Sequence, residues 1–495
     1  MGLEIDRDHF ADEEYQRFEE RLEDNLRALR DVLARPGFGE GDQTLGAELE
    51  LHLVDASGRP APINREVLAS AGDPRITLEA DRFNLEVNAR PVAAQGAPFS
   101  ALAAELESAL SNVRRAAAQH AARVATIGIL PTLTERDLTG SALTDGNRYR
   151  ALVAGINRLR QAPAPLNIQG VDSLSLDGTE FAFEGANTSF QIHIRVSPAA
   201  FARTYNAAQM ATAPVLAAAC NSPLFLGRRL WEETRIALFR QVTDIRTQLE
   251  PNDWRPARVS FGHGWVRRSA LELFAESVAL HPSLLPILGP EDPVKAAREG
   301  LVPELAELRL HQGTVWRWNR AVYDNADGGH LRIELRALPA GPTVTDMVAN
   351  AALYLGVTAA LSSMEDEMMA GFTFGHVLRN FYQAARFGLR AELLWPEAPG
   401  RMARPVDPPA LIEALLPLAR EGLLSMGVDA GEADTWLPIV AERARTGRTG
   451  ARFQREVFDC MITSMSVENA SRALLERYLA ESESGRPVHE WPLPR

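Results

Sequence analysis

The chain has 495 residues, and 52 Lys and Arg against 65 Asp and Glu give it a net charge of −13. With 46% apolar and 24% charged residues, its composition is that of a folded globular protein and excludes a chain that is disordered or fibrous throughout. The acidic balance lacks the basic surface that nucleic-acid binding by counterion release needs, so we expect no nucleic-acid partner.

Cysteine usage and the chain's start indicate the cellular compartment. Cys220 and Cys460 form neither a disulfide framework nor a CxxC motif, which favours a reducing cytoplasm. Residues 1–10 carry acidic side chains and lack the basic and apolar regions of a signal peptide, so we expect no signal peptide there. The most apolar helical stretch, residues 346–365, contains asparagine, glycine and serine, so it predicts a buried helix and no membrane span. The oligomeric state stays open.

Lys295 is the only lysine in the sequence. A Walker A loop, GxxxxGK[ST], needs a lysine on the phosphates, but here Val294 replaces its second glycine and Ala296 its hydroxyl residue. The same scarcity argues against protein-kinase chemistry, which uses a strand lysine near the phosphates. Any nucleotide must therefore have its charge met by arginine or metal.

The first part of the chain alternates helices and strands. Apolar residues at three- and four-residue spacing predict an amphipathic helix over residues 8–35, which a Pro-Gly pair ends. Period-2 alternation predicts strands over residues 45–55 and 82–88. Residues 99–121 read as an alanine-rich helix.

Two further strands are predicted, over residues 189–196 and 330–336. Between them, residues 197–250 are expected to be mostly helical, with a break around Asn221-Ser222-Pro223. The last strand leads into another helix that begins near Thr345.

Prolines crowd residues 396–409 and mark the predicted domain boundary, beyond which residues 410–480 read as helices alone. We expect three parts: an N-terminal helix in residues 1–40, a catalytic domain in residues 41–392 and a C-terminal helical region in residues 410–495.

Each of the four strands carries one polar face, because alternate residues of a strand point to the same side. These faces hold Glu48, Glu50 and His52; Asn84, Glu86 and Asn88; Gln191, His193 and Arg195; and Arg332, Glu334 and Arg336. A sheet with one face in water would also show such alternation. However, Glu48 and Glu50 lie roughly 7 Å apart on one face and repel each other unless a cation or water screens them. Hard oxygen donors with an imidazole are typical of Mg²⁺ or Mn²⁺ sites, so the set favours a metal-lined funnel.

In these stretches the sequence resembles the glutamate-cysteine ligase family of the plant and bacterial type, with its carboxylate-amine ligase relatives and, more remotely, glutamine synthetase. The matching stretches are Gly46–Glu50, Asn84–Asn88, Gln191–His193, Asn221–Pro223 with Arg235 downstream, and Arg332–Arg336. The resemblance implies an α+β, glutamine synthetase-like fold: a curved, mostly antiparallel sheet forming a half-barrel funnel with flanking helices. It also implies that residues 41–392 form the ligase domain, with two or three divalent ions on the sheet.

The resemblance also implies roles for individual residues. Glu50 and Glu86, with Glu79 as a candidate third ligand, match one metal site, and Glu48 and Glu334 match a second. Gln191 and His193 occupy the strand on which relatives place a further ligand, and which of the two contacts the ion stays open. The catalytic residues are expected to be Arg336, which meets the transferring γ-phosphoryl group, Glu50 and Glu334. Substrate or ATP contacts are expected from Asn84, Asn88, Arg235 and Arg332, and the alternative for Arg235 is a surface ion pair with Glu232, three residues earlier on the same helix face.

The implied activity is ATP- and Mg²⁺-dependent amide formation from amino-acid and amine substrates, with glutamate and cysteine as the default pair. A carboxylate takes the γ-phosphoryl group, and an amine then displaces phosphate from the acyl phosphate. Alternatives are a guanidino-kinase-like phosphotransferase, a non-catalytic nucleotide- or amino-acid-binding sensor of the same fold, and a metal-dependent hydrolase without an ATP requirement.

Overall fold

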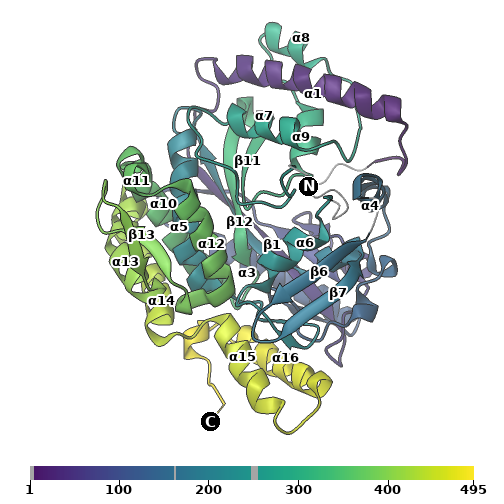
Figure 1. Cartoon of the computed structure of the whole chain (residues 1–495), viewed down its shortest axis with the longest axis vertical. Helices are drawn as coiled ribbons and strands as arrows, with labels where there is room; N and C mark the ends of the chain where they lie inside the picture. The colour runs from purple at the N-terminus through teal and green to yellow at the C-terminus, as the bar shows by residue number, and fades with distance from the viewer. Residues whose placement is uncertain (1–4, 161–162, 247–254, 495) are drawn as a thin grey trace.

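A central antiparallel sheet organises the computed structural model, which describes residues 5–160, 163–246 and 255–494 (Figure 1). Its main strands follow the order β11-β12-β8-β1-β3-β2, and β4 and β5 also pair with β1. The strands are β1 (Thr44–Val54), β2 (Ile76–Leu78), β3 (Asn84–Asn88), β4 (Val92–Ala93), β5 (Arg123–Ala125), β8 (Ser189–Val196), β11 (Asn319–Asp324) and β12 (His330–Pro339). The sheet curls into an antiparallel half-barrel, which confirms the predicted fold class.

The strand register brings the polar faces together. Glu50 of β1 lies opposite Glu86 of β3, and Glu48 lies opposite Gln191 of β8. On the other side of β8, His193 lies opposite Glu334 of β12. Because neighbouring residues in register project to the same side of a sheet, one polar face runs across all four strands.

The opposite face of the sheet is apolar and covered by helices. Leu49, Leu51, Ile192 and Leu335 have no exposed surface and belong to the main hydrophobic core. The covering helices are α3 (Pro98–Gln119), α5 (Phe201–Ala219) and α10 (Val344–Ser362). Among the described residues, α10 has the length and composition to cross a membrane, but 89% of its apolar window is buried inside the protein, as the sequence predicted.

The N-terminal helix α1 (Asp12–Leu33) packs on a layer of short helices at one end of the sheet (Figure 1). These are α7 (Leu271–Leu280), α8 (Pro293–Arg298) and α9 (Ala306–Gln312). Arg35, just beyond α1, donates to the Leu301 carbonyl at 2.6 Å, which ties the end of the helix to this layer.

Smaller elements fill the connections between the strands. The helices are α2 (Asn64–Ala71), α4 (Asn147–Arg160), α6 (Thr234–Val242), α11 (Glu365–Gly371) and α12 (Phe374–Phe387). The hairpins are β6 (Ala164–Gln169) with β7 (Ser173–Thr179), and β9 (Leu224–Phe225) with β10 (Arg228–Arg229).

The C-terminal region begins with a hairpin and continues as helices, as predicted. The hairpin joins β13 (Leu393–Pro396) to β14 (Ala403–Val406), and the helices are α13 (Pro408–Ser425), α14 (Ala430–Thr446), α15 (Gly450–Met461) and α16 (Val467–Glu483). Helix α13 packs directly on α10, where a Cβ atom on Gly422 would lie 2.0 Å from the Gly356 carbonyl oxygen. Helices α15 and α16 contribute to a second hydrophobic core that includes Tyr478 and Trp491.

The structure confirms three of the predicted helices, with ends that differ by a few residues. These are the helices over residues 8–35, over residues 99–121 and from Thr345 onward. The helical prediction for residues 197–250 is correct for α5 and α6. The break between them is longer than expected, because it contains the β9–β10 hairpin. Residues 247–250 of that prediction lie outside the described residues.

Candidate active site

The polar face of the sheet carries two groups of three side chains whose ligand atoms lie within 4.8 Å of one another. One group is Glu50, Glu79 and Glu86; the other is Glu48, His193 and Glu334. We call them the three-carboxylate group and the histidine group. Their membership follows the two sets that the sequence predicted, and among Gln191 and His193 it is the histidine that lies between two carboxylates.

The histidine group spans strands β1, β8 and β12. His193 Nε2 lies 3.2 Å from Glu48 Oε1 and 3.7 Å from Glu334 Oε1. Although this nitrogen is buried, it has no hydrogen-bond partner of acceptable geometry. A buried imidazole nitrogen that faces two carboxylates without bonding either suits a shared metal ligand set.

Arg336 connects the two groups. Its Nη1 donates to Glu334 Oε1 at 3.1 Å and also to Gln191 Oε1. The Gln191 amide in turn donates to Glu50 Oε1 at 3.0 Å, and the Ser189 backbone N–H donates to Glu50 Oε2 at 2.6 Å. The candidate catalytic residues Glu50, Glu334 and Arg336 are therefore joined through one amide side chain.

The electrostatics of the two groups differ. Burial, followed by the charges of Glu86 and Glu50, raises the pKa of Glu79 well above its usual value. Burial and the charges of Glu48 and Glu50 raise the pKa of Glu86 to about 7. By contrast, burial alone would raise the pKa of Glu334, but Arg320, Arg336 and His193 lower it below its usual value. The three-carboxylate group is thus short of positive charge, and the histidine group is not.

Asn88 and Asn84 lie on the same polar face with different partners. Asn88 Nδ2 donates to Glu86 Oε1 at 2.8 Å and to Thr77 Oγ1 at 3.1 Å, so it orients a carboxylate of the site. Asn84 Nδ2 lies 3.2 Å from His52 Nδ1, and its own carbonyl oxygen is buried without a partner.

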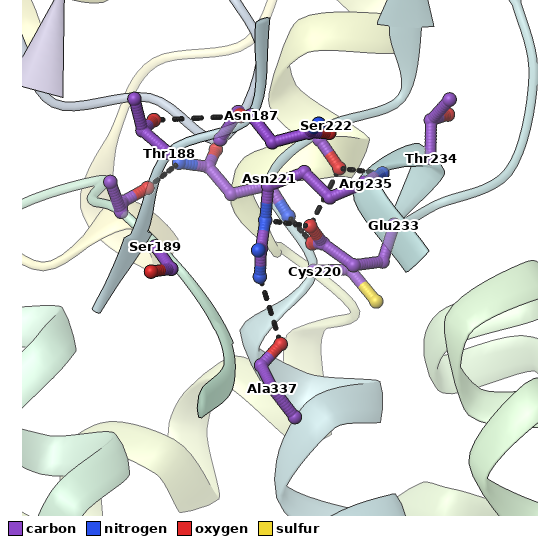
Figure 2. A network of polar contacts seen from close by, with 12 residues as sticks. Asn187, Thr188, Ser189, Cys220, Asn221, Ser222, Glu233, Thr234, Arg235 and Ala337 are labelled. Carbon is purple, nitrogen blue, oxygen red and sulfur yellow. Dashed lines mark hydrogen bonds and ion pairs between the residues drawn. The ribbon is translucent and has the colours of Figure 1, made fainter. Parts of the chain in front are cut away.

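The two remaining predicted arginines form their hydrogen bonds with residues outside the two acidic groups. Arg332 donates to Asp324 Oδ2 at 2.8 Å, and in the described part of the chain it bonds to neither group. Figure 2 shows Arg235 buried beside Glu233, to which it donates at 2.8 Å, while Nη2 reaches the Ala337 carbonyl at 2.9 Å. The expected alternative partner, Glu232, instead pairs with Arg390 and Arg455.

The contact with Ala337 places Arg235 next to the Arg336 segment of β12. The pairing of β12 with β8 shifts register between Leu335 and Leu338, which interrupts the ladder at this point. Arg235 supplies the Ala337 carbonyl with a donor there, and Glu233 in turn accepts from the Ser222 hydroxyl at 2.6 Å and the Asn221 N–H at 2.9 Å (Figure 2). The predicted Asn221–Pro223 motif thus supports the strand that carries Arg336.

Three further side chains at the site were not predicted as metal ligands or catalytic residues. Glu184, in the 3-10 helix η3 (Phe181–Ala186), has its pKa raised to about 8 by burial and by the charge of Glu50. Asp81 is fully buried with both carboxyl oxygens unpartnered, and a Cβ on Gly185 would lie 2.3 Å from its Cγ. Arg320 of β11 lies opposite Glu334 and donates to it at 3.0 Å. Asp81 and Glu184 lie outside the strands, where the sequence shows no periodic signal. Arg320 instead belongs to a cluster of tryptophan and arginine residues, 316–320, that stands out in the sequence.

The residues present fit divalent cations. Oxygen donors from five glutamates and one imidazole nitrogen converge in the two groups, which is the ligand chemistry of Mg²⁺ and Mn²⁺. The raised pKa values of Glu79 and Glu86 indicate the same: three carboxylates held this close together call for a cation to stabilise their charged form.

The fold and the two acidic groups define the class of the protein as a glutamine synthetase-like ligase. The profile of glutamate-cysteine ligase family 2 (GCS2) matches residues 44–475, so the chain belongs to this family. As a member it is an enzyme, a ligase of the glutamate-cysteine type.

Solved structures are similar to this chain, and the first one shows the same fold. The glutamate–cysteine ligase of Francisella tularensis, described in complex with AMP, is 10% identical with a TM-score of 0.51 and aligns over 92% of this chain and 91% of its own. The bifunctional glutathione synthetase of Pasteurella multocida is 11% identical with a TM-score of 0.46, over 94% of this chain and 55% of that one. The Pup ligase PafA, described in complex with Pup, is 10% identical with a TM-score of 0.41, over 89% and 72% of the two chains. No protein of curated function shows a significant sequence match.

Proposed function

We propose that the enzyme is an ATP- and divalent-metal-dependent carboxylate-amine ligase that works through an acyl phosphate. The observation that carries the proposal is the convergence of two acidic groups on one sheet face, with Arg336 bonded to Glu334 and, through Gln191, connected to Glu50. ATP is the co-substrate, and two or three Mg²⁺ or Mn²⁺ ions are the cofactors.

The reaction requires a carboxylate anion to attack a polyanion. Bound cations would supply neutralisation of phosphate oxygens and alignment of the attacking and leaving groups. Glu48, His193 and Glu334 would hold one cation, and Glu50, Glu79 and Glu86 another. Arg336 presents a planar guanidinium that stays charged and accommodates the transferring phosphoryl group. Its side chain is held by Gln191 and Glu334, and Arg235 holds the backbone of the next residue at the Ala337 carbonyl.

The substrates follow from family membership. We infer an amino-acid carboxylate as the acceptor of the phosphoryl group and an amine as the final nucleophile, with glutamate and cysteine as the first pair to test. Asn84 shares the polar face of β3 with Glu86, so we infer that its amide orients the substrate or a carboxylate of the site.

The guanidino-kinase alternative receives no support from Cys220. Cys220 is fully buried, its thiol donates to the Leu216 carbonyl, and burial raises its thiol pKa well above the usual value. A reactive cysteine is exposed with a lowered pKa, so this residue is a packing residue.

The test incubates the purified protein with Mg-ATP, hydroxylamine and single amino acids, and scores ADP and hydroxamate. One carboxylate substrate is expected to give both products in equal amounts. ADP without hydroxamate, or a phosphorylated guanidino product, would replace the ligase assignment. No dependence on ATP would favour a hydrolase, and no turnover with any amino acid would favour a binding protein.

Variants then locate the reaction. Glu50→Gln and Arg336→Ala are expected to abolish hydroxamate formation while the circular dichroism spectrum and melting temperature stay close to those of the unmodified enzyme. Turnover that is unchanged in both variants would remove the proposed site. Arg379→Ala, which removes an exposed pair with Glu392, is the matched control.

A further inference from the structure

A second group of buried polar side chains lies away from the two acidic groups, at the layer of short helices beneath α1. Arg258 precedes α7, His281 and Ser283 follow it, and His311 belongs to α9. Each of the four is at most 3% exposed. In the described part of the chain, no hydrogen bond or ion pair joins them to either acidic group.

Arg258 is a buried cation without a counter-ion. Both terminal nitrogens donate to a single acceptor, the Pro282 carbonyl, at 3.1 and 2.6 Å, and Nε has no partner. No carboxylate pairs with this guanidinium among the described residues. Burial lowers its pKa to about 9, which still leaves it charged at neutral pH. A buried charge is strongly destabilising unless an opposite charge neutralises it.

The neighbours of Arg258 also present unpartnered polar atoms. Both ring nitrogens of His281 and the hydroxyl of Ser283 lack hydrogen-bond partners. His311 Nε2 lies 3.0 Å from the Ser277 carbonyl, and its Nδ1 has no partner. His281 and Ser283 flank Pro282, whose carbonyl Arg258 contacts, so the segment that carries these two side chains lies against the guanidinium. Protein interiors seldom leave several such atoms unpaired in one place.

Nearby charges leave this group positive. Arg317 is 2% exposed and donates to Glu276 Oε1 at 2.7 Å, the oxygen that His263 Nε2 also approaches at 3.7 Å. Glu276 is therefore already paired. Burial and, after it, the positive charges of Arg258 and Arg317 lower the pKa of His281 to about 2, so the ring stays neutral at neutral pH.

We propose that Arg258, His281 and Ser283 bind a small inorganic anion, of the size of chloride or phosphate, that neutralises Arg258. The guanidinium Nε–H, a neutral imidazole N–H and a hydroxyl are donors to such an anion, and the enclosure of all three side chains limits the ligand to a small one. The anion connects the ends of α7 and α9 and thereby stabilises the layer on which α1 packs.

Anomalous diffraction from crystals of the full chain soaked in sodium bromide tests the site directly. A bromide peak within hydrogen-bond distance of Arg258 Nε supports the proposal. Electron density for water alone at this position, in crystals that show bromide elsewhere, would overturn it. This measurement uses the unmodified protein, so it does not depend on the folding of any variant.

Thermal unfolding with EDTA, at constant ionic strength, tests the energetic role. The reference buffer contains gluconate, an anion that is too large for the enclosed group. Chloride or phosphate then replaces the gluconate. At a concentration 100 times its dissociation constant, the bound anion is expected to raise the melting temperature by about 2 to 3 °C. A response to phosphate alone would identify a tetrahedral oxyanion, and a response to chloride a halide.

Arg258→Gln keeps a hydrogen-bonding side chain but removes the charge. It is expected to lose the response to the anion and, in gluconate, to unfold at the same temperature as the unmodified protein or a higher one, because it carries no uncompensated buried charge. Arg420→Gln, which removes an exposed arginine paired with Asp434, keeps the full response. A full response in Arg258→Gln would place the effect at another site and refute the proposal.

Discussion

Arg336 shows how one side chain organises the chemistry of the site. It is bonded to Glu334 and Gln191, and its backbone follows a register shift in β12 that Arg235 supports at the next carbonyl. Such contacts fix the direction of the guanidinium before substrate arrives. Since preorganised charges need no rearrangement during the reaction, their alignment contributes directly to the rate.

We predict that Arg336→Lys lowers kcat by about 100-fold or more, because lysine keeps the charge but lacks the planar fork that meets two partners. The KM for ATP is expected to change much less than kcat. Steady-state ADP release measures both constants. Arg379→Lys is the control, and a kcat within twofold of the unmodified enzyme for Arg336→Lys would contradict the assigned role.

Asp81 provides a pH-dependent test at the residue scale. Burial, and next the charge of Glu184, raises the pKa of Asp81 well above its ordinary value of 3.8. Stability from a group with a raised folded-state pKa is fully present below the unfolded pKa and is lost as the pH rises towards the folded pKa. Asn lacks this titration. We predict that Asp81→Asn becomes increasingly more stable than the unmodified protein between pH 5 and pH 9 in denaturant unfolding, and a constant difference would refute the shift.

At the scale of elements, close packing of α10 on α13 holds the C-terminal helices against the sheet's covering layer. Gly356 and Gly422 meet at this crossing, where a Cβ on Gly422 would lie 2.0 Å from backbone oxygen. We predict that Gly422→Ala destabilises the protein by about 1 to 3 kcal/mol, because overpacking outweighs the gain in helix propensity. Urea unfolding measures the change. Gly431→Ala, with open space around its Cβ position in α14, should instead be neutral or slightly stabilising.

Metal binding is a prediction about several strands at once, since the ligands come from β1, β3, β8 and β12 and from Glu79 beside β2. We predict that Mg²⁺ or Mn²⁺ raises the melting temperature and that EDTA reverses the rise. The pKa of Glu86 is raised to about 7 by burial and by Glu48 and Glu50, so protons compete with the cation at low pH. The metal-dependent rise should therefore be larger at pH 8 than at pH 6.

Glu86→Gln is the matched variant for this measurement. It removes the charge of one ligand and is expected to reduce the response to the metal ion, with no catalytic assay involved. An equal response at both pH values, or a full response in Glu86→Gln, would show that the ions bind elsewhere.

At the scale of the whole molecule, the C-terminal helices hold the loop that supports the active site. Tyr478 of α16 accepts from Asn221 Nδ2 at 2.8 Å and donates to the Thr126 carbonyl at 2.9 Å. Gln454 of α15 donates to the Asn221 carbonyl at 2.9 Å. Asn221 in turn donates to Glu233, the partner of Arg235. A path of direct contacts therefore runs from α15 and α16 to the strand of Arg336.

We predict that Tyr478→Phe costs about 1 to 2 kcal/mol of stability, because it leaves the buried Thr126 carbonyl without its donor, and that it also lowers kcat. Urea unfolding and hydroxamate formation give the two measurements. Thr463→Ala, which removes an exposed hydroxyl from α15's end, is expected to change neither. A loss of stability with unchanged kcat would show that the helices support the fold and not the site.

Local patterns were enough to predict four strands of the sheet and the side chains of their shared polar face. Period-2 alternation in β1, β3, β8 and β12 identified the polar side chains, because which residues share a face of a strand follows from backbone geometry alone. Repulsion between Glu48 and Glu50 then indicated a cation. The same patterns could not identify Glu184 or Asp81, which reach the site from a 3-10 helix and a loop whose positions depend on distant packing.

By itself the sequence determined the family, the polar faces and the residues that line them, since these are properties of short segments. Only the tertiary structure decided how the segments meet: the strand register placed His193 between Glu48 and Glu334, and the chain brought Arg235 to the Ala337 carbonyl at the register shift of β12. It also enclosed Arg258 without a counter-ion. These features depend on which distant backbones approach one another, and the free energy that selects those contacts comes from burial of the whole core.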